Sequence, residues 1–128
     1  MKRHILDENF PAPAVQALRL KVASVAQVRQ DWGESGWLDM ELLPQLHGSK
    51  ATFHTLDAGF FKRRYGHQSY CLVYYDVSEV ELEDWVVKFL RHPSFKTHIQ
   101  RLGKVIRVSP SKLACWELHH PQMKEIEW

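Results

Sequence analysis

The strongest local signals in the sequence lie side by side in residues 70–90, YCLVYYDVSEVELEDWVVKFL. The segment 70–75 is short, apolar and aromatic and contains no Gly or Pro, which is typical of a buried strand. Ser78 and Glu81 then form a capping-box pattern at the start of a predicted helix. The apolar stripe of that helix consists of Leu82, Trp85, Val86, Phe89 and Leu90. A strand that leads directly into an amphipathic helix favours an α/β fold.

The rest of the chain repeats this alternation. Further strands are predicted at 3–6, 23–28, 51–55, 104–108 and 113–118, the last two as a hairpin around a Ser-Pro-Ser turn. Helices are predicted at 11–21 and 37–46, with short helical stretches at 57–66 and 95–102. Strands separated by helices imply right-handed crossovers, hence a central, mostly parallel sheet flanked by helices in three layers. We expect one domain over residues 1–120 and a peripheral tail at 121–128.

Composition excludes several classes of protein. The chain has 128 residues, of which 45% are hydrophobic and 25% charged, and this is typical of a single globular domain. Its aromatic content argues against disorder, and no apolar run approaches the roughly 20 residues of a membrane-spanning helix. Cys71 and Cys115 lie in strand-like runs, so we expect buried free thiols. These features predict a cytoplasmic protein without a membrane partner.

The net charge of +2 is small, but its distribution is uneven. The segment 85–116 contains seven Lys or Arg residues and no Asp or Glu, and Lys62, Arg63 and Arg64 form a second basic cluster. Either segment could be an ordinary solvated face or a surface that contacts phosphate groups. Charge alone does not decide between the two.

Carboxylates occur where predicted strands end. Asp7 follows the first strand and Asp57 the third, and Asp39 begins the intervening helix. The carboxyl ends of parallel strands share one edge of a sheet, which predicts that these groups meet in one crevice. Their mutual repulsion would favour a hard cation such as Mg²⁺ or Mn²⁺. Singly, each has a structural alternative: Asp39 and Asp57 suit helix N-caps, and Asp7 suits a turn.

Other chemistry has less support in the sequence. His54 lies within a predicted strand and is expected to be a hydrogen-bonded core residue, and His119 and His120 are expected on the surface. The sequence has no G-x-S-x-G elbow, P-loop or G-x-G-x-x-G pattern, which argues against a serine hydrolase and a nucleotide cofactor.

Three segments carry a resemblance to a known family. They are LDENFP at 6–11, LDME at 38–41 and TLDAGF at 55–60. In this order they resemble the short PIN-like ribonuclease domains, relatives of the VapC-type toxins, and the likeness extends to about His120. The resemblance implies a PIN-like three-layer fold and an Mg²⁺- or Mn²⁺-dependent endoribonuclease that is the toxin of a prokaryotic toxin–antitoxin pair. Its implied partners are RNA, a cognate antitoxin and a second copy of the chain.

The resemblance also assigns roles to individual residues. The implied metal ligands and catalytic residues are Asp7, Asp39 and Asp57. Glu8 and Asn9 would support them, and the Thr55 hydroxyl would lie near the metal. The basic residues that would position the RNA backbone are Lys62, Arg63 and Arg64.

The sequence departs from the family at one acidic position. The family pattern T-x-D-x-D-F has an acid where this chain has Gly59. Glu41 is a candidate substitute for that carboxylate. The alternative function is a catalytically degenerate PIN-like module that binds RNA or a protein partner through the basic 85–116 segment.

Overall fold

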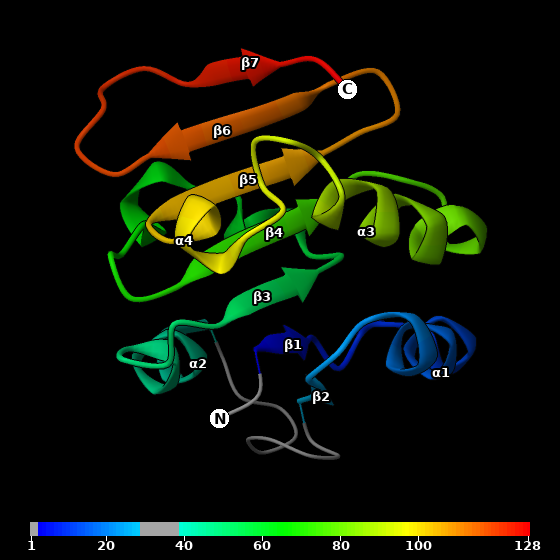
Figure 1. The fold of residues 1–128 in the computed structure, drawn as a ribbon. Coiled ribbons are helices and arrows are strands. Elements are labelled where there is room, and N and C mark those ends of the chain that lie inside the picture. Colours follow the sequence, from blue (N-terminus) through cyan, green and yellow to red (C-terminus); the bar gives the residue numbers. More distant parts are fainter. Residues whose placement is uncertain (1–2, 29–38) are drawn as a thin grey trace.

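The computed structural model describes residues 3–28 and 39–128, the first two helical residues after the gap by their backbone alone. One seven-stranded sheet forms the centre of the molecule, in the order β2-β1-β3-β4-β5-β6-β7 (Figure 1). The strands are β1 (His4–Leu6), β2 (Val25–Gln27), β3 (Thr52–Thr55), β4 (Cys71–Tyr75), β5 (Lys104–Val108), β6 (Leu113–Glu117) and β7 (Lys124–Ile126). The first five are parallel, and β6 and β7 are antiparallel to their neighbours. The predicted α/β class and mostly parallel sheet are confirmed.

Helices cover both faces of the sheet. They are α1 (Ala12–Lys21), α2 (Asp39–Leu46), α3 (Leu82–Leu90) and α4 (His98–Arg101), with 3₁₀ turns η1 (Ala58–Phe60), η2 (Arg63–Tyr65) and η3 (Glu79–Glu81). One apolar cluster joins the sheet to α1 and α3, and a second joins it to α2 and η1. The arrangement is therefore three layers, as predicted. Within the described residues, no helix has the length and hydropathy required to cross a membrane.

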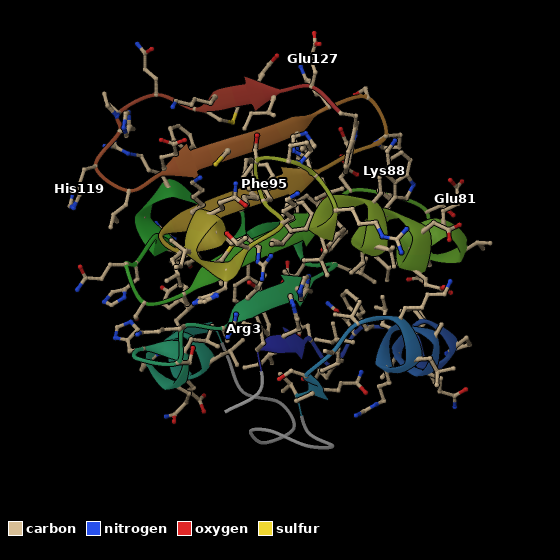
Figure 2. The ribbon with its side chains drawn as sticks, viewed as in Figure 1. Arg3, Glu81, Lys88, Phe95, His119 and Glu127 are labelled. Atoms are coloured by element: carbon tan, nitrogen blue, oxygen red, sulfur yellow. The ribbon has the colours of Figure 1, made fainter. Side chains whose placement is uncertain are left out.

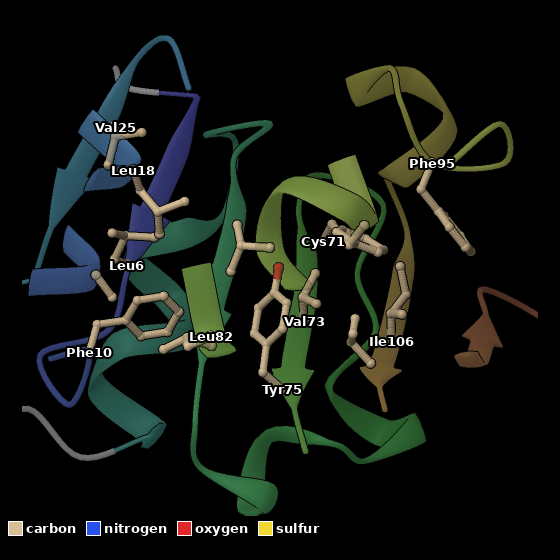
Figure 3. Packing of buried hydrophobic residues seen from close by; sticks show 14 of the residues in the cluster. Leu6, Phe10, Leu18, Val25, Cys71, Val73, Tyr75, Leu82, Phe95 and Ile106 are labelled. Atoms are coloured by element: carbon tan, nitrogen blue, oxygen red, sulfur yellow. The ribbon is translucent and has the colours of Figure 1, made fainter. Parts of the chain in front are cut away.

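Strand register decides which side chains enter each layer. Ile5 pairs with Phe53 and faces α2, whereas Leu6 lies in the cluster beneath α1 and α3. Tyr75 packs edge-on against Phe89 of α3, with ring centroids 6.3 Å apart. Figure 3 shows Tyr75 in the same apolar cluster as Val73 and Leu82. The same alternation carries His4, Thr52 and His54 onto the α1 and α3 face, where they form a polar group inside an apolar layer.

The predicted capping box at Ser78 and Glu81 is corrected by the structure. Ser78 makes no side-chain capping bond, because residues 79–81 form a 3₁₀ turn and α3 begins only at Leu82. The capping box of this region belongs to α4, where the Thr97 side chain accepts from the Gln100 N–H and the Gln100 side chain accepts from the Thr97 N–H. A polar residue three positions before a Glu therefore matched the pattern without forming the bonds.

The segment expected to be a peripheral tail extends the sheet. β7 pairs with β6 and makes the last strand. The Trp128 indole N–H donates to the Ser109 carbonyl at 2.7 Å, and its ring lies 5.3 Å from that of Trp85. Trp128 thus fastens the end of the chain to α3 and to the β5–β6 turn.

The two cysteines are buried free thiols, as predicted. Burial raises the pKa of both, that of Cys115 to about 11. The sequence also predicts a turn rich in Gly and polar residues at 31–36, and this segment lies outside the described residues, as do Trp32 and Trp37.

Candidate functional site at the carboxyl edge of the sheet

Asp7 and Asp57 follow the carboxyl ends of two neighbouring parallel strands. β1 and β3 pair directly, and the ladder continues one step beyond β1 because the Asp7 N–H donates to the His54 carbonyl at 2.8 Å. Asp57 comes two residues after β3 ends. The predicted adjacency of the two strand ends is therefore confirmed.

The side chain of Thr55 connects the two acidic residues. Its hydroxyl donates to Asp7 Oδ2 at 2.6 Å and accepts from the Asp57 N–H at 3.0 Å. Thr55 is fully buried, so this hydroxyl is held in place by the sheet. The sequence placed Thr55 near the acids by family resemblance. The structure shows that its hydroxyl orients one carboxylate and anchors the backbone of the other residue.

Asp7 is a carboxylate in a largely buried position, with 9% of the residue exposed. Its Oδ1 accepts from the Glu8 N–H at 2.8 Å. Burial raises the pKa of Asp7, the hydrogen bonds from Thr55 and Glu8 oppose that rise, and the negative charges of Glu8 and Asp57 add to it. A carboxylate held in this way keeps its geometry at a cost in stability, which is typical of groups that serve a site.

Asp57 is exposed and caps η1, since its Oδ1 accepts from the Gly59 N–H at 2.8 Å. The capping alternative foreseen from the sequence is thus correct for Asp57. It does not exclude a second role, because only one carboxylate oxygen is used by the cap and the charge of Asp57 reaches Asp7.

Gly59 lies against the Asp57 carboxylate. A Cβ built at this position would be 3.0 Å from Asp57 Oδ1, so any side chain here would crowd the cap. An acid at position 59 would therefore bring another carboxylate directly beside Asp57. This chain has a glycine there, whose backbone N–H donates to the Asp57 carboxylate.

Supporting residues hold the segment after β1. Asn9 Oδ1 accepts a long hydrogen bond, 3.5 Å, from the Leu56 N–H, which ties the loop after β1 to the loop after β3. The Gln27 amide donates to the carbonyls of Asp7 and Phe10 at 3.3 and 3.4 Å. Glu8 is partly exposed and contributes negative charge. Sequence reasoning named Asn9 and Glu8 but missed Gln27, because a Gln in a short strand carries no motif.

The other two predicted acids lie on α2. Asp39 is the first residue of that helix, and its side chain lies outside the described part of the structure. Glu41 is exposed. Among the described residues, no group of three or more His, Cys, Asp or Glu side chains is arranged to hold a metal ion. The structure therefore brings Asp7 and Asp57 together, and the convergence of a third carboxylate stays a prediction.

The predicted RNA-contacting cluster lies elsewhere on the molecule. Lys62 and Arg64 lie over the Tyr65 ring, 5.8 and 5.1 Å from its centroid. Arg63 and Arg64 line a recess of about 390 Å³ together with Gly103, which directly precedes β5. That recess is at the amino end of β5, whereas Asp7 and Asp57 follow carboxyl ends.

A different arginine lies closer to the acids. Arg107 of β5 pairs with Tyr74 in the sheet and stacks over Phe61, with its guanidinium carbon 5.4 Å from the ring centroid. Its Nε is buried and has no hydrogen-bond partner among the described residues. Burial and then the charge of Asp76 raise the pKa of Tyr74; Arg107 opposes this and Asp57 adds to it. Tyr74 thus lies within electrostatic reach of both Arg107 and Asp57.

Comparison of the chain with protein-family models, with curated proteins and with solved structures finds no match.

Proposed function

We propose that this protein is a PIN-like, Mg²⁺- or Mn²⁺-dependent endoribonuclease, the toxin component of a prokaryotic toxin–antitoxin pair that acts in the cytoplasm. One observation carries the proposal: Asp7 and Asp57 follow the ends of adjacent parallel strands, and the hydroxyl of Thr55 donates to the Asp7 carboxylate and accepts from the Asp57 backbone N–H. The family name, the antitoxin, and dimer formation come from the sequence resemblance alone.

The oxygen donors at this edge fit a hard cation. Mg²⁺ retains several waters and is commonly held by one or two carboxylates together with substrate phosphate oxygens. Asp7 and Asp57 supply two carboxylates, and Asp39 is the proposed third ligand. When bound, the ion would neutralise these charges and lower the pKa of a coordinated water for attack on a phosphodiester.

The chain's own residues would position the reactants. Thr55 orients the buried Asp7 carboxylate, and Asn9 ties the two site loops together. Arg107 is the described cation best placed for an RNA phosphate, because its Nε lacks a partner and its charge acts on the same surroundings as Asp57. Lys62, Arg63 and Arg64 would contact RNA farther from the acids.

Cleavage of a mixed RNA substrate tests the proposal. We expect cleavage with Mn²⁺ and none with EDTA. In Asp7→Asn the cleavage rate should fall by about a hundredfold or more, because a site ligand is removed. The matched control is Asp84→Asn, which changes an exposed carboxylate on α3 and is expected to keep full activity. Equal loss in both variants, or activity that survives EDTA, would refute the assignment.

Gly59 favours a second candidate, a non-catalytic module that binds RNA or a protein partner through the basic 85–116 segment. Gly59→Asp distinguishes the two, since it would add a carboxylate beside Asp57. If the wild-type protein is inactive and binds RNA, and this variant gains Mn²⁺-dependent cutting, the module is correct and the missing acid is the reason. If the wild-type protein already cuts, the site works without that acid.

A further inference from the structure

The amino edge of the sheet has a recess lined by basic residues, in contrast to the acidic site at the carboxyl edge. Its volume is about 560 Å³, within the range of roughly 300–1,000 Å³ that small-molecule sites occupy. Its polar lining comes from the starts of β1 and β2, from the segment that leads into α4 and from α4 itself: Arg3, His4, Ser24, Lys96, Thr97, His98 and Arg101. Of the described residues that line it, none is Asp or Glu. Figure 2 shows Arg3 beside the amino end of β1.

The central cation of this recess is buried. Only 4% of Arg101 is exposed, its Nε donates to Thr52 Oγ1 at 2.9 Å, and its Nη1 donates to the Phe95 carbonyl at 2.7 Å. Both acceptors are neutral. In the described part of the chain, no carboxylate lies within ion-pair distance of Arg101, and its Nη2 has no hydrogen-bond partner. A guanidinium stays charged at any working pH, so burial without a counter-charge is unfavourable and an anion would relieve it.

A second donor reaches the recess through a chain of hydrogen bonds. His54 Nδ1 lies 2.7 Å from the Tyr75 hydroxyl, and His54 Nε2 lies 3.0 Å from His4 Nδ1. The fully buried Tyr75 hydroxyl has a proton to donate, and His54 is its one partner among the described residues. Tyr75 therefore donates to His54 Nδ1, and His54 donates from Nε2 to His4 Nδ1. In this order His4 Nδ1 accepts, so the proton of the neutral His4 ring is on Nε2. His4 lines the recess and therefore offers it an N–H donor.

The surroundings of both recess histidines are strongly positive. Burial first, and then the charges of Arg101 and Arg3, lower the pKa of His4 to about 3. Desolvation and the charges of Arg3, Arg101 and Lys50 lower the pKa of His98. Cations from three parts of the sequence thus gather at one edge, where an anion would pair with several of them at once.

We propose that this recess binds a phosphate group, held by the Arg101 guanidinium and the His4 Nε2–H inside and by Arg3 and Lys96 at the rim. Arginine pairs with phosphate through charge-assisted, often bidentate, hydrogen bonds. The phosphate belongs either to a free phosphomonoester or to the 5′ end of an RNA; the chemistry at the recess is the same. The site lies at the edge opposite Asp7 and Asp57 and does not depend on the ribonuclease assignment.

The test uses two variants of equal charge. Arg3→Gln/Lys96→Gln removes two exposed cations at the rim of the recess. Lys88→Gln/Arg91→Gln removes two cations at the C-terminal end of α3, which line a different hollow; Figure 2 shows Lys88 far from Arg3. Inorganic phosphate is titrated at constant ionic strength, and the Arg101 Nε–H and His4 Nε2–H resonances are followed by NMR. We expect both to shift in the wild-type protein, with affinity about tenfold weaker in the rim variant and unchanged in the control. No shift of either resonance, or equal weakening in both variants, would overturn the proposal.

Two further titrations identify the source of the phosphate. A short RNA with a 5′-phosphate is compared with the same RNA lacking it, and adenosine monophosphate serves as the small ligand. Tighter binding of the phosphorylated RNA than of the monophosphate assigns the recess to RNA ends, and the reverse assigns it to a free phosphomonoester. No shift at Arg101 with either the phosphorylated RNA or adenosine monophosphate would refute the site.

Discussion

The two ends of the same parallel strands carry opposite charge and hold it in different ways. At the carboxyl edge, a buried Asp7 carboxylate is surrounded by donors, namely the Thr55 hydroxyl and a backbone N–H. At the amino edge, a buried Arg101 guanidinium finds only neutral acceptors. The Asp7 carboxylate is thus held by hydrogen-bond donors within the fold, whereas the Arg101 guanidinium has no anion beside it among the described residues. The comparison teaches that a single sheet can present one site for a cation and another for an anion.

Two threonines of β3 provide the sharpest test of this contrast. Thr55 and Thr52 are both buried; one binds the acid and the other binds the cation. We expect Thr55→Val to lower the free energy of unfolding by about 3 kcal/mol at pH 7, because a buried carboxylate and an N–H each lose a partner. Thr52→Val loses one bond and should cost about half as much. Urea unfolding of both variants measures the difference, and equal losses would contradict the contrast.

We expect low pH to destabilise the protein mainly through the buried histidines His4 and His54. His4 has a pKa of about 3 in the folded protein against 6.5 ordinarily, so the unfolded chain binds more protons below pH 6.5 and stability falls as the pH decreases. Between pH 6.5 and 5 this amounts to about 2 kcal/mol for His4. The pKa of His54 is also lowered, by burial first, and acts in the same direction.

Unfolding at pH 7 and pH 5 measures this effect. His4→Asn should remove part of the pH dependence, and His119→Asn, at an exposed position, should leave it unchanged. A wild-type protein equally stable at both pH values would show that the buried histidines are not neutral.

Asp7 should behave in the opposite sense. Its pKa is raised in the folded protein, so its contribution to stability is present at low pH and is lost as the pH rises through the folded pKa. At pH 7 we therefore expect Asp7→Asn to raise stability by about 1 kcal/mol, as is common when a site residue is removed. Thermal unfolding measures the gain. A more stable variant that has lost cleavage would separate function from folding, and a less stable one would make Asp7 a structural residue.

The smallest expected effect concerns repulsion at the rim of the amino-edge recess. Arg3→Gln/Lys96→Gln should raise the melting temperature by roughly 1 °C at low ionic strength, because like charges near Arg101 are removed, and the gain should vanish in salt. The Lys88→Gln/Arg91→Gln variant should show no such gain. Melting curves at two salt concentrations test this. A gain in melting temperature that persists at high salt would mean that altered packing, and not relief of charge repulsion, is the cause.

The acidic pair was partly predictable and the basic recess was not. Asp7 and Asp57 each follow an apolar, strand-like run, so the common edge of a parallel sheet predicts their proximity. Arg101 belongs to the basic 85–116 segment, for which the sequence favours neither a solvated face nor a phosphate-contacting surface. Only the structure shows that Arg101 is buried against Thr52. Arg107 was hidden in the same run, and no local signal indicated its unpartnered Nε beside Phe61.

By itself, the sequence determined the first six strands, the principal helices and the three-layer α/β class, because hydrophobic periodicity and turn residues act over a few neighbouring positions. Capping at α3, the β7 edge strand and the pairing of polar groups between distant strands were decided by tertiary structure. The His4–His54–Tyr75 hydrogen-bond chain joins residues up to 71 positions apart in the sequence. Such contacts depend on strand order and register, and these are fixed only when the whole sheet packs against its helices.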